Sequence, residues 1–201
     1  MSQDIAMSGY PRIILKSDNE PAIIELKREA IKTVREELGV EVVPEESMAY
    51  QSETAGVIEQ AVQAVEGTIR TLKFATEELH NVKLLPNSPV LVWAAEYAGQ
   101  IISRAHKYSG DGRTAFELRK GKAYKRKLPV FGEKVLAITV GKKRMKSEYR
   151  TFGAIFLRLA ERSDMLVVGN GDGCVRVAAV RRLPSGLRRD GDMLLSLKGL
   201  P

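Results

Sequence analysis

The sequence contains one cysteine, two histidines and one tryptophan among its 201 residues. The single cysteine, Cys174, excludes an intramolecular disulfide and a cysteine-rich zinc site. It also favours a reducing compartment, either the cytoplasm or the nucleus. The two histidines, His80 and His106, do not have zinc-ligand spacing, so we interpret both as ordinary surface or half-buried residues.

Long apolar runs are also absent. The longest, Val90 to Ala95, stops at Glu96, well short of the roughly 20 residues that a membrane-spanning helix needs. The first residues, Met1 to Asp4, lack the basic and then apolar pattern of a secretory signal. Hydrophobic residues make up 44% of the chain and charged residues 28%, which is ordinary for a folded protein. We therefore expect one large or two small folded domains and no membrane partner.

The net charge of +7 is unevenly distributed along the chain. Residues 1–110 carry a net charge of −5, whereas residues 111–201 carry +12. This asymmetry indicates that the C-terminal half holds an anionic polymer, and the alternative is a basic solubilising surface. Nine basic residues are candidates for contacts with nucleic-acid phosphates: Lys122, Lys125, Arg126, Lys127, Lys142, Lys143, Arg144, Arg181 and Arg182.

The first half of the chain has the pattern of alternating strands and helices. Residues 12–17 are apolar and partly β-branched, which predicts a short buried strand. Pro21 suits the first turn of a helix, with Asp18 or Asn19 available as the N-cap, and Gly39 is expected to end that helix.

A second strand is expected at residues 40–43 and a polar loop at 44–54. The next helix is predicted by apolar residues at 4-3-4-3 spacing, which form one buried stripe: Ile58, Val62, Val65, Ile69 and Leu72. Glu59 falls on the neighbouring polar face. Further helices are expected from Ser88-Pro89 onward and at residues 114–120.

The sequence of the second half of the chain predicts a small antiparallel sheet or barrel after a basic linker at residues 121–129. A strong hairpin signal lies at residues 170–173, and residues 185–201 are expected to be a flexible tail. Four segments have the composition of strands: residues 130–140, 151–159, 165–169 and 174–180. The predicted fold class is therefore α/β followed by a small all-β module at 130–184.

Two carboxylates are candidates for metal binding. Asp18 follows a predicted strand and Glu59 lies near the start of a predicted helix, so both side chains can converge on one divalent cation. Taken alone, Asp18 is equally well explained as a helix cap, and Glu59 as one charge on a solvated helix face.

Several segments resemble the retroviral-type integrases of Copia-like retrotransposons. The first segments are Leu15-Lys16-Ser17-Asp18-Asn19-Glu20, Gly39-Val40-Glu41-Val42-Val43, Gln51-Ser52 and Gly56-Val57-Ile58-Glu59. In that family a strand ends in Asp-Asn, a helix follows, and a loop then leads into the helix that bears the catalytic Glu. The resemblance continues in order through later segments: Ile69 to Lys73, Trp93 and Tyr97, Asp111 to Glu117, Phe131 to Val135, Gly153 to Leu157, Val175-Arg176, and Val180 to Pro184.

The resemblance implies a partial RNase H-like catalytic core at residues 1–120, with the order strand-helix-strand-helices. Asp18 would be the second and Glu59 the third carboxylate of an Asp, Asp, Glu triad. Such a triad binds Mg²⁺ for DNA strand transfer, so the parent class is a polynucleotidyl transferase. The implied partners are the element's cDNA ends, target DNA and other copies of the same chain.

The sequence departs from the family pattern at the first carboxylate, which should lie on a strand well upstream, whereas only 17 residues precede Asp18. Glu20, Ala55 and Gln60 also replace the residues usual in the family. We therefore expect an N-terminally truncated integrase fragment that binds DNA weakly and is catalytically inactive as this chain. The alternatives are a non-enzymatic DNA- or chromatin-binding protein derived from a retroelement, and a relic without function.

Overall fold

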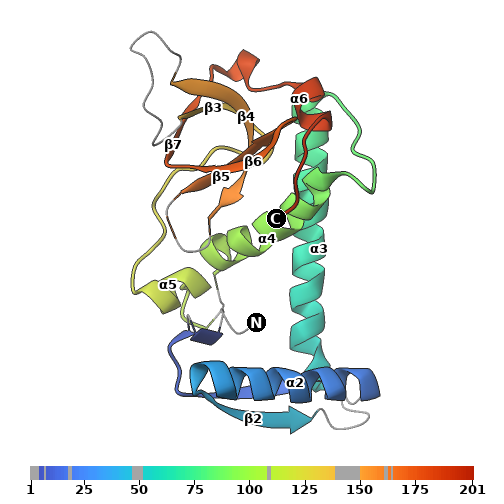
Figure 1. Ribbon diagram of the computed structural model, residues 1–201, viewed down its shortest axis with the longest axis vertical. Helices are drawn as coiled ribbons and strands as arrows, with labels where there is room; N and C mark the ends of the chain where they lie inside the picture. Colours follow the sequence, from blue (N-terminus) through green and yellow to red (C-terminus); the bar gives the residue numbers. More distant parts are fainter. Residues whose placement is uncertain are drawn as a thin grey trace. The chain divides into compact units, whose positions relative to one another are not determined.

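The computed structural model divides the chain into two compact units, Met1–Val62 and Gln63–Pro201 (Figure 1). Along the sequence, the boundary falls within helix α3 (Ser52–His80). The residues that the structure describes are 5–6, 8–17, 20–46, 52–107, 110–138, 150–160, 163 and 165–201. The predicted order of an α/β part followed by an antiparallel sheet is confirmed.

The first unit contains a β-α-β motif. Strands β1 (Arg12–Ser17) and β2 (Glu41–Glu46) are parallel and in register from Arg12 opposite Glu41 to Ser17 opposite Glu46. Helix α2 (Pro21–Leu38) connects them, because parallel neighbours need a crossover rather than a tight hairpin. The predicted strand-helix-strand order is confirmed, and β2 continues to Glu46 where a loop was expected.

Helix α2 begins at Pro21 and is capped at its C-terminus by Gly39, as the sequence predicts. Pro21 occupies the first turn, and Gly39 takes a left-handed conformation (φ 63°) with its N–H donating to the Arg35 carbonyl at 3.1 Å. The N-cap, however, is Glu20, whose side chain makes no capping hydrogen bond. The prediction of a cap at residues 18–19 is therefore wrong, because a proline at the first helical position makes the preceding residue the cap.

The first unit buries few apolar side chains. Val34 of α2 and Val42 of β2 are both buried. The Val42 carbonyl accepts a hydrogen bond from Arg35 Nη2 at 2.8 Å. By contrast, Ile14 of β1 is 65% exposed and Leu26 of α2 is 70% exposed. Parallel sheets are normally covered on both faces, so a two-stranded sheet with one helix leaves apolar surface uncovered.

Helix α3 does not form one continuous buried stripe. Ile69 and Leu72 pack against the hydrophobic core of the second unit. Ile58 and Val62 are exposed, so the prediction is wrong for these first two members. The reason is that the hydrophobic core of the second unit extends along α3 only from Ile69 onward.

The second unit holds a five-stranded sheet with the order β6-β5-β4-β3-β7, in which every neighbouring pair is antiparallel (Figure 1). The strands are β3 (Lys134–Ile138), β4 (Thr151–Leu159), β5 (Leu166–Asn170), β6 (Gly173–Val177) and β7 (Ala179–Arg182). The predicted hairpin is confirmed, because Asn170 pairs with Gly173 across the turn. The last predicted strand is divided at Ala178 into β6 and β7, and residues 139–149 lie outside the described residues.

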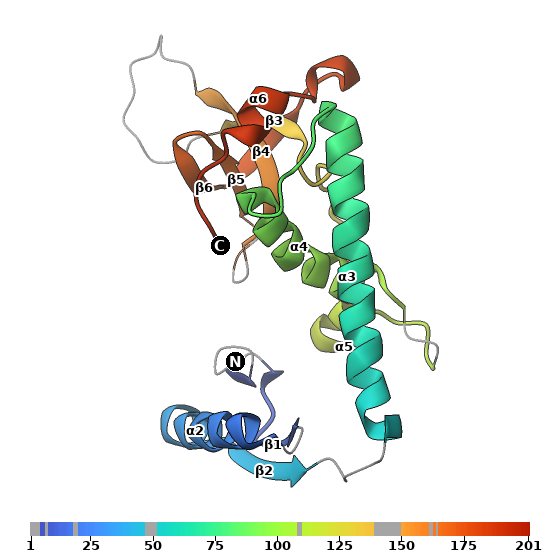
Figure 2. The ribbon, with the colours of Figure 1, turned by 90° about the vertical axis from the view of Figure 1, so that its right-hand side faces the viewer.

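Helix α4 (Pro89–Ala105) lies against β4 and supplies one side of the core (Figure 2). The Tyr97 ring meets the Phe156 ring edge-on, with the centroids 5.7 Å apart. The Gln100 amide donates to the Leu159 carbonyl at 2.8 Å and accepts from the Leu159 N–H at 3.0 Å. This side chain therefore satisfies both backbone groups of Leu159, which keeps the end of β4 attached to the helix.

Residues after β7 are part of the folded unit. They form the short helices η1 (Ser185–Leu187) and α6 (Gly191–Leu195). Leu194 and Leu197 are buried in the hydrophobic core, and Trp93 Nε1 donates to the Gly199 carbonyl at 2.9 Å. The prediction of a flexible tail at residues 185–201 is therefore wrong. The composition of this segment, rich in Gly, Arg and Asp, does not indicate that Leu194 and Leu197 complete the core.

We expect Leu194→Ala to destabilise the protein by about 2–5 kcal/mol, because it removes a side chain with 0% exposure from the core. The matched control is Leu195→Ala, the next residue, which is 56% exposed and should change stability by less than about 0.5 kcal/mol. Chemical denaturation of both variants measures the difference. Equal effects of the two substitutions would show that α6 does not pack as described.

Candidate nucleic-acid interface

A capped helix leads into the basic linker. Helix α5 (Ala115–Lys120) starts with a capping box, in which the Glu117 N–H donates to Thr114 Oγ1 at 3.1 Å and the Thr114 N–H donates to Glu117 Oε2 at 2.8 Å. Gly121 ends the helix in a left-handed conformation (φ 69°), with its N–H donating to the Glu117 carbonyl at 2.8 Å. Helix α5 therefore has a defined end, and the basic linker starts at Gly121.

The basic segment, defined as residues 121–130, is held by its apolar side chains. The Tyr124 ring meets the Phe116 ring edge-on with centroids 5.3 Å apart, and Leu128 packs against the hydrophobic core. The four basic side chains between and around these contacts are exposed: Lys122, Lys125, Arg126 and Lys127. No Asp or Glu occurs between residues 121 and 132. Fixed backbone and uniform positive charge are suited to contacts with phosphate groups.

Two more of the predicted residues, Arg181 and Arg182, are neighbours on β7 but have different surroundings. Arg182 donates to both oxygens of Glu133, from Nε at 2.8 Å and from Nη2 at 2.6 Å. Arg188 Nε lies 3.4 Å from the same carboxylate, and the Val130 N–H donates to it at 3.0 Å. Arg181 is exposed. The Arg182 guanidinium is thus part of a structural ion pair, and Arg181 is the better placed of the two for phosphate.

Glu133 is ionised although its side chain is only 1% exposed. Burial opposes the charge, but hydrogen bonds from Arg182 and from the Val130 N–H outweigh it and hold the pKa of Glu133 below its usual value. The hydrogen bonds to Glu133 correspondingly raise the pKa of Arg182. The buried carboxylate therefore needs its arginine partner to remain charged.

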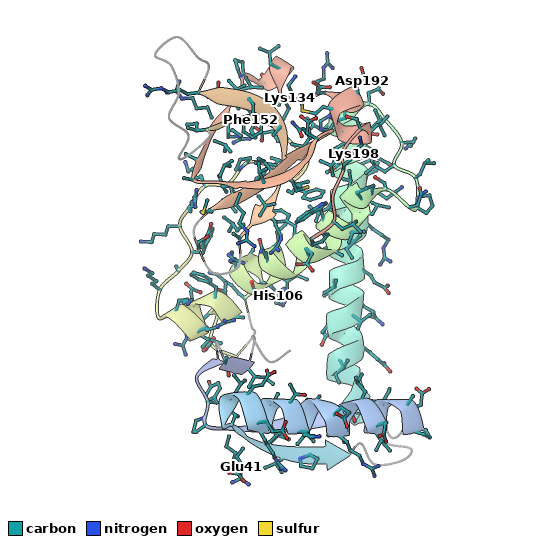
Figure 3. The ribbon with its side chains drawn as sticks, viewed as in Figure 1. Glu41, His106, Lys134, Phe152, Asp192 and Lys198 are labelled. Atoms are coloured by element: carbon teal, nitrogen blue, oxygen red, sulfur yellow. The ribbon has the colours of Figure 1, made fainter. Side chains whose placement is uncertain are left out.

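His80 is buried and does not match the sequence-based interpretation of a surface or half-buried residue. Its Nε2 lies 2.7 Å from the Gly132 carbonyl, and its Nδ1 accepts from the Asp190 N–H at 2.9 Å. Lys134, which is labelled in Figure 3, donates in turn from Nζ to Asp190 Oδ2 at 2.6 Å. The imidazole therefore ties the end of α3 to the turn before β3 and to the start of α6, through hydrogen bonds that no local sequence pattern reveals.

The structure describes only one of the two predicted metal ligands. Glu59 is exposed on the side of α3, as its position on the polar face predicts. Asp18 lies outside the described residues. Within the described part of the chain, no group of three or more His, Cys, Asp or Glu side chains is arranged to hold a metal ion.

A different carboxylate, Glu77, is the most firmly held on α3. It accepts from the Leu84 N–H at 2.8 Å and pairs with Lys73 at 3.0 Å and Lys83 at 3.3 Å. The backbone hydrogen bond from Leu84 and then the pair with Lys73 lower its pKa to about 2. Because its oxygens already accept from the Leu84 N–H and from two lysines, Glu77 holds the loop after α3 and is not a candidate metal ligand.

The remaining predicted basic residues, Lys142, Lys143 and Arg144, lie outside the described residues. Among the helices that the structure describes, none is long and apolar enough to cross a membrane. No protein-family model matches the sequence, and no curated protein matches it.

We expect Arg182→Gln to destabilise the fold by about 1–3 kcal/mol, because it removes two hydrogen bonds from the buried Glu133 carboxylate while Arg188 still lies beside it. Arg181→Gln removes the same charge from the preceding residue and should change stability by less than about 0.5 kcal/mol. Urea denaturation of the two variants tests this. A stable Arg182→Gln protein would mean that the pair is not structural.

Proposed function

We propose that this chain binds DNA without sequence preference through contacts with the phosphate backbone. The observation that carries the proposal is the basic segment, whose four lysine and arginine side chains are exposed on an anchored backbone in a stretch without Asp or Glu from residue 121 to residue 132. The exposed Arg181 on β7 adds to this charge. Binding of this kind depends on release of counterions from DNA, so it is strongly salt-dependent.

We further propose that the chain corresponds to the later part of a Copia-like integrase. The order of β1, α2, β2 and α3 supports this, because the resemblance implies a strand ending at Asp18, a helix, a second strand and then the helix with Glu59. The exposed Ile14 and Leu26 support it too, since the further strands and helices of a larger α/β domain would bury such side chains. The antiparallel sheet that follows agrees with the C-terminal β module of these proteins.

In the parent activity, two Mg²⁺ ions about 3.5–4 Å apart would polarise the attacking and leaving oxygens of the phosphodiester. The proposal assigns Asp18 and Glu59 as two of the three carboxylates that hold these ions. The described residues of this chain do not form a metal-binding group by themselves. We assign no catalytic step to the chain and propose, from the resemblance, that strand transfer requires a third carboxylate.

The DNA-binding proposal predicts a linear fall of log affinity for random duplex DNA with log salt concentration. The triple variant Lys122→Gln, Lys125→Gln, Lys127→Gln should lower the slope by about 2.7, at about 0.9 for each phosphate that is no longer neutralised. Fluorescence anisotropy at several salt concentrations measures both quantities. The matched control removes three exposed charges from the first unit: Arg12→Gln, Arg28→Gln and Lys32→Gln. Affinity that is independent of salt, or an equal change in the control, would refute the proposal.

The integrase proposal predicts no Mg²⁺-dependent strand transfer by the chain alone. A fusion that adds a strand bearing one more Asp ahead of Met1 should gain this activity, and Glu59→Gln should abolish it. Glu66→Gln is the control, because Glu66 is an exposed carboxylate two turns further along the same helix. If the fusion stays inactive while DNA binding holds, the non-enzymatic DNA-binding alternative is favoured.

A further inference from the structure

A cavity of about 260 Å³ opens on the second unit between α4, the basic segment and the end of β4. Its apolar wall includes Ile101, Leu128 and Leu159, and two aromatic side chains, Tyr97 and Tyr124, complete it. The volume lies just under the range of about 300–1,000 Å³ that is usual for small-molecule sites. The cavity therefore has room for one small ligand and not for a folded polymer.

Two arginines, Arg104 and Arg126, also line the cavity, and none of the lining residues is an Asp or Glu. The Arg104 guanidinium lies over the rings of Phe116 and Tyr124, at 5.4 and 5.3 Å from their centroids. Contacts of this kind hold the guanidinium in place, so its charge is preorganised. Arg126 is exposed and belongs to the basic segment. The electrostatics of the cavity favour an anion.

Gln100, one of the polar residues that line the cavity, is committed to the fold. The Gln100 amide, at the wall of the cavity, is bonded on both sides to the backbone of Leu159. Tyr97 is buried against Phe131, and burial raises its pKa to about 12, so its hydroxyl stays neutral. A ligand would accordingly meet apolar and aromatic surface inside the cavity and positive charge from the arginines.

We infer that this cavity binds a single nucleotide, with the base against Tyr124 and the apolar wall and the phosphate against Arg126 and Arg104. Base–aromatic stacking and arginine contacts are the usual means by which proteins hold unpaired nucleotides. The inference rests on the proposed nucleic-acid binding for its source of nucleotides, and it goes beyond that proposal by naming a site for one unpaired base. The same chemistry would also bind a free nucleoside monophosphate.

The test is isothermal titration calorimetry of the full chain with deoxyadenosine monophosphate. We expect saturable binding that Arg126→Gln weakens by about tenfold or more. The control is Arg119→Gln, which removes an equal charge from an exposed position on α5 outside the cavity. A second variant, Ile101→Trp, fills the cavity with both arginines retained and should abolish binding at an unchanged melting temperature. Absence of saturable binding, or equal loss in the Arg119 control, would overturn the inference.

Competition separates the two sources of the ligand. A short single-stranded oligodeoxyadenylate that displaces the mononucleotide and binds more tightly identifies a nucleic-acid strand, whereas failure to displace it identifies a free nucleotide. The result is also independent of duplex binding, because the triple lysine variant leaves Arg126 intact. If the unsubstituted chain binds the mononucleotide but shows no salt-dependent binding to duplex DNA, only the proposed function is refuted. If it binds duplex DNA in a salt-dependent way but does not bind the mononucleotide, only the cavity site is refuted.

Discussion

The buried carboxylate of Glu133 is the constraint on which the second unit depends. It binds Arg182 at the edge strand and contacts Arg188 beyond it, while the adjacent Gly132 carbonyl contacts His80 at the end of α3. Segments from opposite ends of the unit therefore meet around one charge that has almost no access to water. Such a charge is tolerated only when its partners are all in place, so the ion pair specifies how β3, β7 and the residues after them come together.

Much of the fold could be predicted from the sequence because its signals are local. The first strand is indicated by the apolar composition of residues 12–17. Helix α2 is indicated by Pro21 at its start and by Gly39 just after its end. The hairpin is indicated by the turn sequence from Asn170 to Gly173. What could not be predicted depends on distant partners. The burial of Leu194 needs the sheet and α4 to exist first, and a tail rich in polar residues and glycine does not indicate this.

The candidate site also contains residues that the sequence could identify and residues that it could not. Net charge identifies the basic segment, since exposure of lysine is the default and needs no knowledge of partners. Charge alone cannot distinguish Arg181 from Arg182, because the carboxylate that engages Arg182 lies 49 positions away in the sequence. The assignment of Asp18 and Glu59 rests on order and spacing within a family resemblance. The exposed position of Glu59 agrees with a helix-face carboxylate of either a metal site or a solvated surface.

The hydrogen bond from Trp93 to the Gly199 carbonyl has a spectroscopic consequence. Trp93 is the only tryptophan in the chain, so the intrinsic indole fluorescence comes from one environment at the point where the last residues dock onto α4. Release or proteolytic removal of the C-terminal residues would expose this indole to solvent and shift its emission to longer wavelength. The protein thus carries a built-in optical reporter of the state of its own C-terminus.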